Sequence, residues 1–146
     1  MRRWPRSARS FRPLRRLVLL GVLAAVTAGC GAVGRVTSGD PATGKALFVA
    51  KCGTCHTLAA AHTIGTLGPN LDNAFRADKS PTFASAGTEQ TIRDVVRGQI
   101  AYPETDPGTG HPGMTANLLH GQQAKDVAVF VAKCVDVPSC TVTAAG

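Results

Sequence analysis

Beyond its first sixteen residues, the chain has no excess of positive charge. Seven of its sixteen Lys and Arg residues are arginines in that stretch, and the nine that follow are matched by nine Asp and Glu residues. A domain that binds nucleic acid needs a basic surface of its own. The formal net charge of +7 is therefore no evidence for a nucleic-acid partner, and we expect none.

Methionine is also scarce, and there is no internal repeat. The only two methionines are Met1 and Met114. With 146 residues, 44% of them hydrophobic, the chain has enough apolar material for one modest core. We therefore expect a single folded domain, in which only Met114 could offer a thioether, since Met1 belongs to a removable N-terminal segment.

That segment, residues 1–29, is typical of an export signal, with arginines, then the apolar stretch Leu17 to Val26, then small residues. Three outcomes are open. Ordinary cleavage could follow Ala28, or the segment could stay as an anchor, because the uncharged run from Leu17 to Gly34 just reaches spanning length. Alternatively, residues 27–30 form a lipobox and Cys30 is lipidated.

We favour lipidation of Cys30. Ala28 and Gly29 suit a lipobox, although Thr27 is a weak residue where Leu is usual. Residues 30–39, which are small and polar, would then be a tether, and residues 40–146 the domain. Each of the three outcomes delivers the domain to the outer, extracytoplasmic face of the cytoplasmic membrane, held there by the lipid or by an N-terminal anchor.

Export determines how the five cysteines are interpreted. In an oxidising compartment we expect Cys134 and Cys140 to form a disulfide. Cys52 and Cys55 belong to a motif of their own, which leaves Cys30 over. Lipidation would account for Cys30; otherwise it is a free thiol removed with the signal or left beside it.

The motif is C-G-T-C-H at residues 52–56, and C-x-x-C-H is the attachment signal for c-type haem. Two thiols three residues apart can each form a thioether with one porphyrin, and His56 can then supply the proximal ligand to iron. Gly53 and Thr54 are small, which would let the macrocycle approach the backbone. No second motif occurs, so we expect one haem.

The motif has two other interpretations. A thioredoxin-like dithiol would follow a strand, whereas the residues before Cys52 have helical spacing. The motif could also be half of a zinc site, although adjacent Cys55 and His56 could hardly share one tetrahedral ion. A structural zinc site built from Cys52, Cys55, Cys134 and Cys140, without haem, is a further alternative.

Three ordered segments resemble the class I cytochromes c. Residues 44–52 resemble that family's N-terminal helix, residues 65–71 its G-P-N-L segment, and residues 121–134 its C-terminal helix. The resemblance covers residues 40–134. It implies an all-α fold of short helices wrapped around one covalently bound haem, with Phe48 packed on Phe130.

The same resemblance implies a set of site residues. The carbonyl of Pro69 would accept a hydrogen bond from the proximal His56, and Pro69 and Leu71 would contact the cofactor. Met114 would be the distal ligand to iron. His111 is its rival, three residues earlier in the same Pro- and Gly-rich loop, because imidazole binds ferric iron strongly.

The remaining elements follow from periodicity and breakers. We expect a helix from the Asp40-Pro41 start to the motif, a loop over residues 72–87 anchored by Phe75 and Phe83, and a helix from Thr88 to Tyr102. In that helix Ile92, Val95, Val96 and Ile100 would form an apolar stripe, with Arg93 and Arg97 facing solvent. A loop over residues 103–113 and a last helix over residues 121–134 complete the domain.

These features predict a mono-haem electron carrier rather than an enzyme, acting between redox-partner proteins whose identity the sequence does not give. The alternative is the haem domain of an extracytoplasmic reductase or peroxidase-type enzyme. Such an enzyme needs an acid–base residue at an open site, for which His62, His111 and His120 are the candidates.

Overall fold

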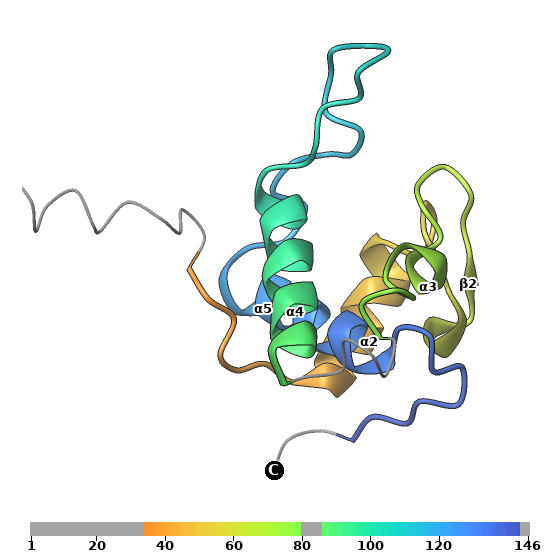
Figure 1. Ribbon diagram of the computed structural model, residues 1–146, viewed down its shortest axis with the longest axis vertical. Helices are drawn as coiled ribbons and strands as arrows, with labels where there is room; N and C mark the ends of the chain where they lie inside the picture. Colours follow the sequence, from red (N-terminus) through yellow and green to blue (C-terminus); the bar gives the residue numbers. More distant parts are fainter. Residues whose placement is uncertain (1–33, 80–85, 144–146) are drawn as a thin grey trace, which may run out of the picture. The chain divides into compact units, whose positions relative to one another are not determined.

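Helices form the described part of the chain, which comprises residues 34–79 and 86–143 of a computed structural model. Within these ranges, sheet is limited to one two-stranded antiparallel hairpin, in which Thr57 pairs with Ile64 and Leu58 with Thr63. The fold prediction, all-α with short helices, is confirmed in these ranges (Figure 1). The elements are α2 (Pro41–Lys51), β1 (Thr57–Leu58), the 3-10 turn η2 (Ala59–Ala61), β2 (Thr63–Ile64), α3 (Leu71–Ala74), α4 (Ala86–Ala101) and α5 (Gly121–Cys134).

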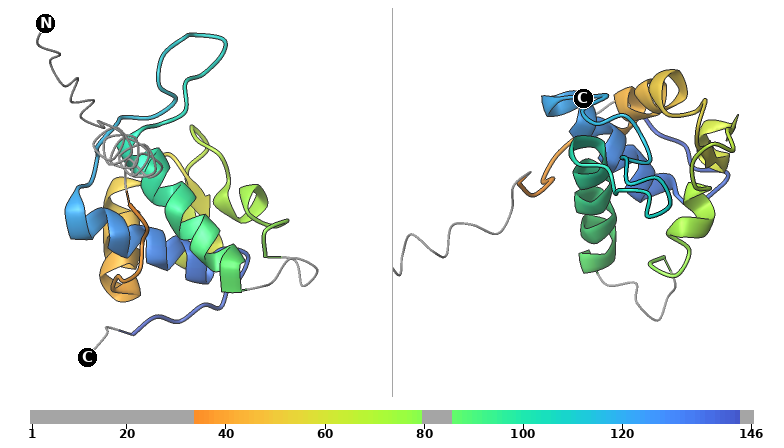
Figure 2. Two further views of the ribbon diagram at one scale, coloured as in Figure 1. Left: turned by 60° about the vertical axis from the view of Figure 1, so that its left-hand side comes forward. Right: turned by 90° about the horizontal axis from the view of Figure 1, so that it is seen from above.

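The last helix, α5, is the centre of the core and packs against both α2 and α4 (Figure 2). Nine of its fourteen residues are buried. Phe48 of α2 meets Phe130 of α5 edge to face, with ring centroids 5.9 Å apart, as predicted. Gly44 lies one turn before Phe48, where α2 comes so close to α5 that a Cβ atom would be 2.1 Å from the carbonyl oxygen of Asp126.

The start of α2 is where the sequence placed it. The side chain of Asp40 accepts hydrogen bonds from the backbone N–H of Ala42 at 3.0 Å and from the hydroxyl of Thr43 at 2.7 Å. Pro41 occupies the first helical position, where its missing N–H costs no hydrogen bond. This cap fixes the helix that leads into the cysteine motif.

Residues 34–39, the described part of the expected tether, are docked rather than free. Val36 is 1% exposed and packs with Ala128 and Val129 of α5. Its N–H donates to Asp94 at 2.8 Å, and its carbonyl accepts from the side-chain amide of Gln90 at 3.0 Å. Within the expected tether, Val36 is therefore packed against the helices of the domain. Residues 1–33, which include the expected signal and Cys30, lie outside the described residues.

The region between the motif and α4 differs from expectation. Where a loop was expected from residue 72, Leu71–Ala74 form the short helix α3, capped by the side chain of Asn70. A single turn is too short to produce a helical periodicity, which is why the sequence did not reveal it. Phe75 packs against the core as expected, Phe83 lies outside the described residues, and α4 begins at Ala86 rather than Thr88.

The faces of α4 also differ in part from the prediction. Ile92 and Ile100 are buried and Val96 packs against them, but Val95 is 42% exposed. Arg93 and Arg97 do not simply face solvent, because the Nε atom of each is buried without a hydrogen-bond partner. Among the helices of the described ranges, none combines the length and apolar character needed to cross a membrane.

Candidate functional site

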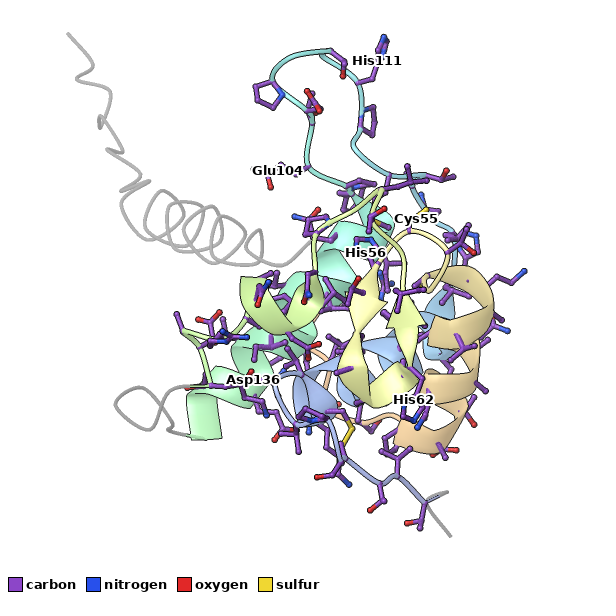
Figure 3. The ribbon with its side chains drawn as sticks, turned by 90° about the vertical axis from the view of Figure 1, so that its right-hand side faces the viewer. Cys55, His56, His62, Glu104, His111 and Asp136 are labelled. Carbon is purple, nitrogen blue, oxygen red and sulfur yellow. A yellow bond between two sulfur atoms is a disulfide. The ribbon has the colours of Figure 1, made fainter. Side chains whose placement is uncertain are left out.

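The cysteine motif forms a tight turn directly after α2. The N–H groups of Cys52 and Gly53 both donate to the carbonyl of Phe48 at 2.8 Å, and that of His56 donates to the carbonyl of Cys52 at 2.9 Å. Both thiols are free and half-buried. The turn therefore delivers two unpaired cysteines and a histidine to one end of a helix, as Figure 3 shows for Cys55 and His56.

Gly53 is required in this turn for a reason the sequence did not suggest. A Cβ atom there would lie 2.5 Å from the Cγ2 atom of Thr63 and 3.0 Å from the carbonyl oxygen of Val49. The missing side chain makes room for the β1–β2 hairpin. The contact with the hairpin is enough to explain why residue 53 is glycine, without the close approach of a macrocycle.

The imidazole of His56 is held from two sides. Its Nδ1 atom lies 2.9 Å from the carbonyl oxygen of Pro69, so Nδ1 carries the proton and donates, which leaves the Nε2 lone pair available to a ligand. Gly68 lies against the ring, since a Cβ atom there would be 2.5 Å from Cε1 of His56. The N–H of Gly68 also donates to the carbonyl of Cys55 at 2.8 Å, which ties the two segments together.

The thiol of Cys52 is unsuited to dithiol redox chemistry. Burial, and then the negative charge that Cys55 can carry, raises the pKa of Cys52 to about 11. A reactive dithiol needs a lowered pKa, because the thiolate is the nucleophile. The raised pKa of Cys52 therefore does not favour the thioredoxin-like interpretation, and the motif follows the helix α2 rather than a strand.

The zinc interpretation is also wrong for the four cysteines proposed. Cys134 and Cys140 form a disulfide, as predicted, with their Cα atoms 5.3 Å apart. Their sulfur atoms are therefore unavailable as thiolate ligands. Across the described residues, no cluster of three or more His, Cys, Asp or Glu side chains could hold a metal ion.

The three other histidines are exposed. His62 has a left-handed backbone with φ of 55° after η2, and His120 precedes α5. In Figure 3, His62 lies away from His56 on the far end of the β1–β2 hairpin. The structure thus does not gather these candidate acid–base residues around His56.

His111 and Met114 belong to a loop that projects beyond the end of α4 (Figure 1). The loop is a narrow hairpin, in which the N–H of Asp106 donates to the carbonyl of His111 at 2.8 Å and that of Gly113 to the carbonyl of Glu104 at 3.0 Å. This pairing holds the exposed His111 far out on the hairpin, well away from His56 (Figure 3). Met114 is half-buried at the base of the hairpin, outside the main core cluster.

The residues around the motif fit a haem. Ile64 and Leu67, next to the turn, are 86% and 84% exposed, which is apolar surface that a large apolar ring could cover. Leu71 is half-buried and packs on the core. Elsewhere, on α4, the Nε atoms of Arg93 and Arg97 are buried without a hydrogen-bond partner, and a carboxylate is the kind of acceptor that would satisfy them.

A small helical domain that presents two free cysteines and an oriented histidine in one turn is a domain for covalent attachment of haem. The chain belongs to the cytochrome c family, because the family model described as cytochrome c matches residues 41–134. That range runs from the first residue of α2 to the last of α5. Membership implies covalent haem c and electron transfer with redox-partner proteins.

Searches of curated proteins and of solved structures found no match.

Sequence reasoning missed two residues that shape this site. Gly68 was given no role of its own within the G-P-N-L segment, but it is the surface on which the imidazole rests. Asp72 was assigned to a loop, yet it is 8% exposed and accepts two backbone hydrogen bonds. Neither contact leaves a signal in a single sequence, apart from the position of Asp72 directly after the G-P-N-L segment.

Proposed function

We propose that this protein is a mono-haem cytochrome c that carries one electron at a time between extracytoplasmic redox partners. The observation that carries the proposal is the bond from Nδ1 of His56 to the carbonyl of Pro69, next to the unpaired thiols of Cys52 and Cys55. A hydrogen bond of this kind fixes the tautomer and orientation of a metal-binding histidine and makes it a better donor.

The site residues have separate roles in this proposal. Cys52 and Cys55 would hold the cofactor through two thioethers, and Nε2 of His56 would bind its iron. Met114 would supply the other protein ligand to the iron, and Pro69 and Leu71 would contact the cofactor. Bound haem would supply an iron centre that takes up and releases one electron, at a potential set largely by its axial ligands.

The chain's own residues keep that site unreactive toward other chemistry. If both His56 and Met114 bind the iron, it would have no free position for a substrate. Gly68 and Pro69 prevent the imidazole from turning, and the packed interface of α2 with α5 supports the turn that carries it. A site that changes little between its two redox states suits electron transfer.

The docking of Val36 limits how far the domain can lie from an anchor. If Cys30 is lipidated, Val36 is the sixth residue after it along the chain. At 3.3–3.6 Å per residue, that segment reaches at most about 20 Å. We therefore propose that the domain stays close to the outer face of the cytoplasmic membrane, because no long tether separates the two. Mass spectrometry of the mature N terminus tests this, since an unmodified N terminus or a retained signal would contradict it.

The experiment for the proposed function is a redox titration of the purified protein followed in the visible spectrum. A single one-electron transition of a low-spin haem, with no peroxide turnover by the native protein, is the expected result. Peroxide turnover with a high-spin spectrum would instead favour the enzymatic alternative. Two resolved transitions would contradict a single haem.

A further inference from the structure

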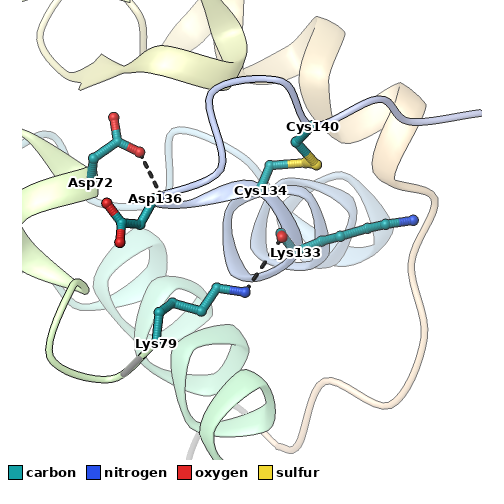
Figure 4. The surroundings of a disulfide bond; sticks show 6 residues. All are labelled: Asp72, Lys79, Lys133, Cys134, Asp136 and Cys140. Atoms are coloured by element: carbon teal, nitrogen blue, oxygen red, sulfur yellow. Dashed lines mark hydrogen bonds between the residues drawn. A yellow bond between two sulfur atoms is a disulfide. The ribbon is translucent and has the colours of Figure 1, made fainter. Parts of the chain in front are cut away.

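Asp72 is one of two buried charged residues among the described residues, at 8% exposure. Its carboxylate is satisfied by two backbone donors that are far apart in the sequence. Oδ2 accepts from the N–H of Ala59 at 2.8 Å, and Oδ1 from the N–H of Asp136 at 2.8 Å. Figure 4 shows the second of these bonds beside the disulfide. A buried carboxylate without such donors would be strongly destabilising, so the two bonds are integral to its placement.

These bonds join three segments around one side chain. Ala59 begins η2, just after the β1 strand that follows His56, and Asp72 itself is in α3. Asp136 follows α5 in the loop that the Cys134–Cys140 disulfide closes. Two weaker, exposed contacts lie beside the bonds to Asp72. Arg76 lies 3.4 Å from Asp136, and Lys79 donates to the carbonyl of Lys133 at 3.4 Å.

The segment that Asp72 fixes also carries the acceptor for His56. Pro69 is three residues before Asp72, and Asn70 between them caps α3. The cap ties Asn70, the residue directly after Pro69, to the start of α3. Where the carboxylate holds α3 against η2, it therefore also holds the Pro69 carbonyl at its 2.9 Å distance from Nδ1 of His56.

We propose that Asp72 is a positioning residue for the axial imidazole, and that through Asp136 it couples the disulfide-closed C-terminal loop to His56. This inference rests on the proposed role of His56 as a ligand of iron. Loss of the carboxylate releases α3 and weakens the hydrogen bond that Pro69 accepts. The imidazole of His56 then becomes a less basic ligand for iron, although its place in the chain next to Cys55 keeps it at the site.

The chain offers a matched control for the loss of a buried carboxylate. Asp126 is 5% exposed, and its Oδ1 accepts from the N–H of Asp40 at 2.8 Å and from the amide of Gln122 at 2.8 Å. It joins the start of α2 to α5 and has no bond to the segment that carries Pro69. Asp72→Ala and Asp126→Ala therefore remove the same charge and similar bonds at different places.

The test measures proton exchange at Nδ1 of His56 by NMR in the haem-loaded protein, relative to exchange at the amide of Phe130 in the core. Asp72→Ala is expected to speed exchange at His56 at least tenfold more than at Phe130, because the opening is local. Asp126→Ala should speed both sites by the same factor. Asp136→Gly keeps the bonded N–H, and glycine suits the φ of 59° at this position. The ratio of the exchange rate at His56 to that at Phe130 should therefore stay as in the wild type.

Two further variants keep the test valid if Asp72→Ala does not fold. Asp72→Asn keeps one acceptor oxygen, and the double substitution Cys134→Ser/Cys140→Ser frees the loop without changing Asp72. Each should raise the ratio of exchange at His56 to exchange at Phe130, but by less than Asp72→Ala. Equal ratios in all variants and wild type would overturn the inference. A wild-type protein whose haem is not bound by His56 would instead overturn the proposed function.

Discussion

A methyl group at Gly44 is predicted to separate the two helices that support the site. In Gly44→Ala the new Cβ would lie 2.1 Å from the carbonyl oxygen of Asp126, 2.5 Å from its carbonyl carbon and 2.8 Å from Cβ of Phe130. An ordinary carbon–oxygen contact is about 3.3 Å, so α2 must withdraw from α5 by roughly 1 Å. The obstructing atoms belong mainly to the backbone, and no rotamer change can relieve the contact.

The magnitude follows from two opposing effects. Overpacking of this kind costs about 1–3 kcal/mol, and a gap of roughly 1 Å loses up to about half of each dispersion contact across the interface, including Phe48 on Phe130. Alanine in place of glycine within a helix gains about 0.8–1 kcal/mol. We expect a net loss of about 2 kcal/mol, which for a domain of this size lowers the thermal midpoint by on the order of 10 °C.

Gly98→Ala is the matched control. Gly98 also lies inside a helix, but nothing is within 4 Å of the position its Cβ would take. The substitution should therefore stabilise the protein by about 0.8–1 kcal/mol and raise the midpoint by roughly 4–8 °C. Thermal unfolding of the haem-loaded protein, followed by circular dichroism, measures both. A neutral or stabilising effect at Gly44 would refute the close approach of α2 and α5.

Three further predictions concern the site and its supports. Gly68→Ala places a Cβ 2.5 Å from the proximal imidazole, so the visible spectrum should show disturbed axial ligation; an unchanged spectrum and potential would argue against this contact. Replacing Cys134 and Cys140 by alanine removes the constraint of a short loop, worth roughly 2 kcal/mol, and should lower the thermal midpoint by on the order of 10 °C; an unaltered midpoint would mean that the disulfide does not stabilise the domain. Met114→Ala should let added imidazole or cyanide bind the ferric protein, whereas His111→Ala should not; the reverse result would identify His111 as the ligand.

The sequence predicted those parts of the fold whose signals are local. The Asp40-Pro41 cap, the limits of α5 and the contact of Phe48 with Phe130 all follow from helix starts, helical spacing and family resemblance. The pairing of Cys134 with Cys140 followed from export and from cysteine arithmetic. Of these features, only the contact of Phe48 with Phe130 joins distant segments, and it was predicted from the family resemblance rather than from a local signal.

The parts that could not be predicted depend on long-range contacts. Val36 looked like part of a polar tether because its burial needs α4 and α5 together. Asp72 looked like a loop residue because its donors come from positions 13 and 64 residues away. Gly68 had a turn-like neighbourhood, and only the placement of His56 reveals why no side chain fits there.

The most direct test of the central claim is tandem mass spectrometry of the peptide that contains residues 52–56. The protein should be made in a host that attaches c-type haem and fully denatured before digestion. We predict that the peptide carries one haem through thioethers at both Cys52 and Cys55. A peptide with free thiols, or with a disulfide between Cys52 and Cys55, would contradict the assignment of this protein as a haem-carrying electron-transfer protein.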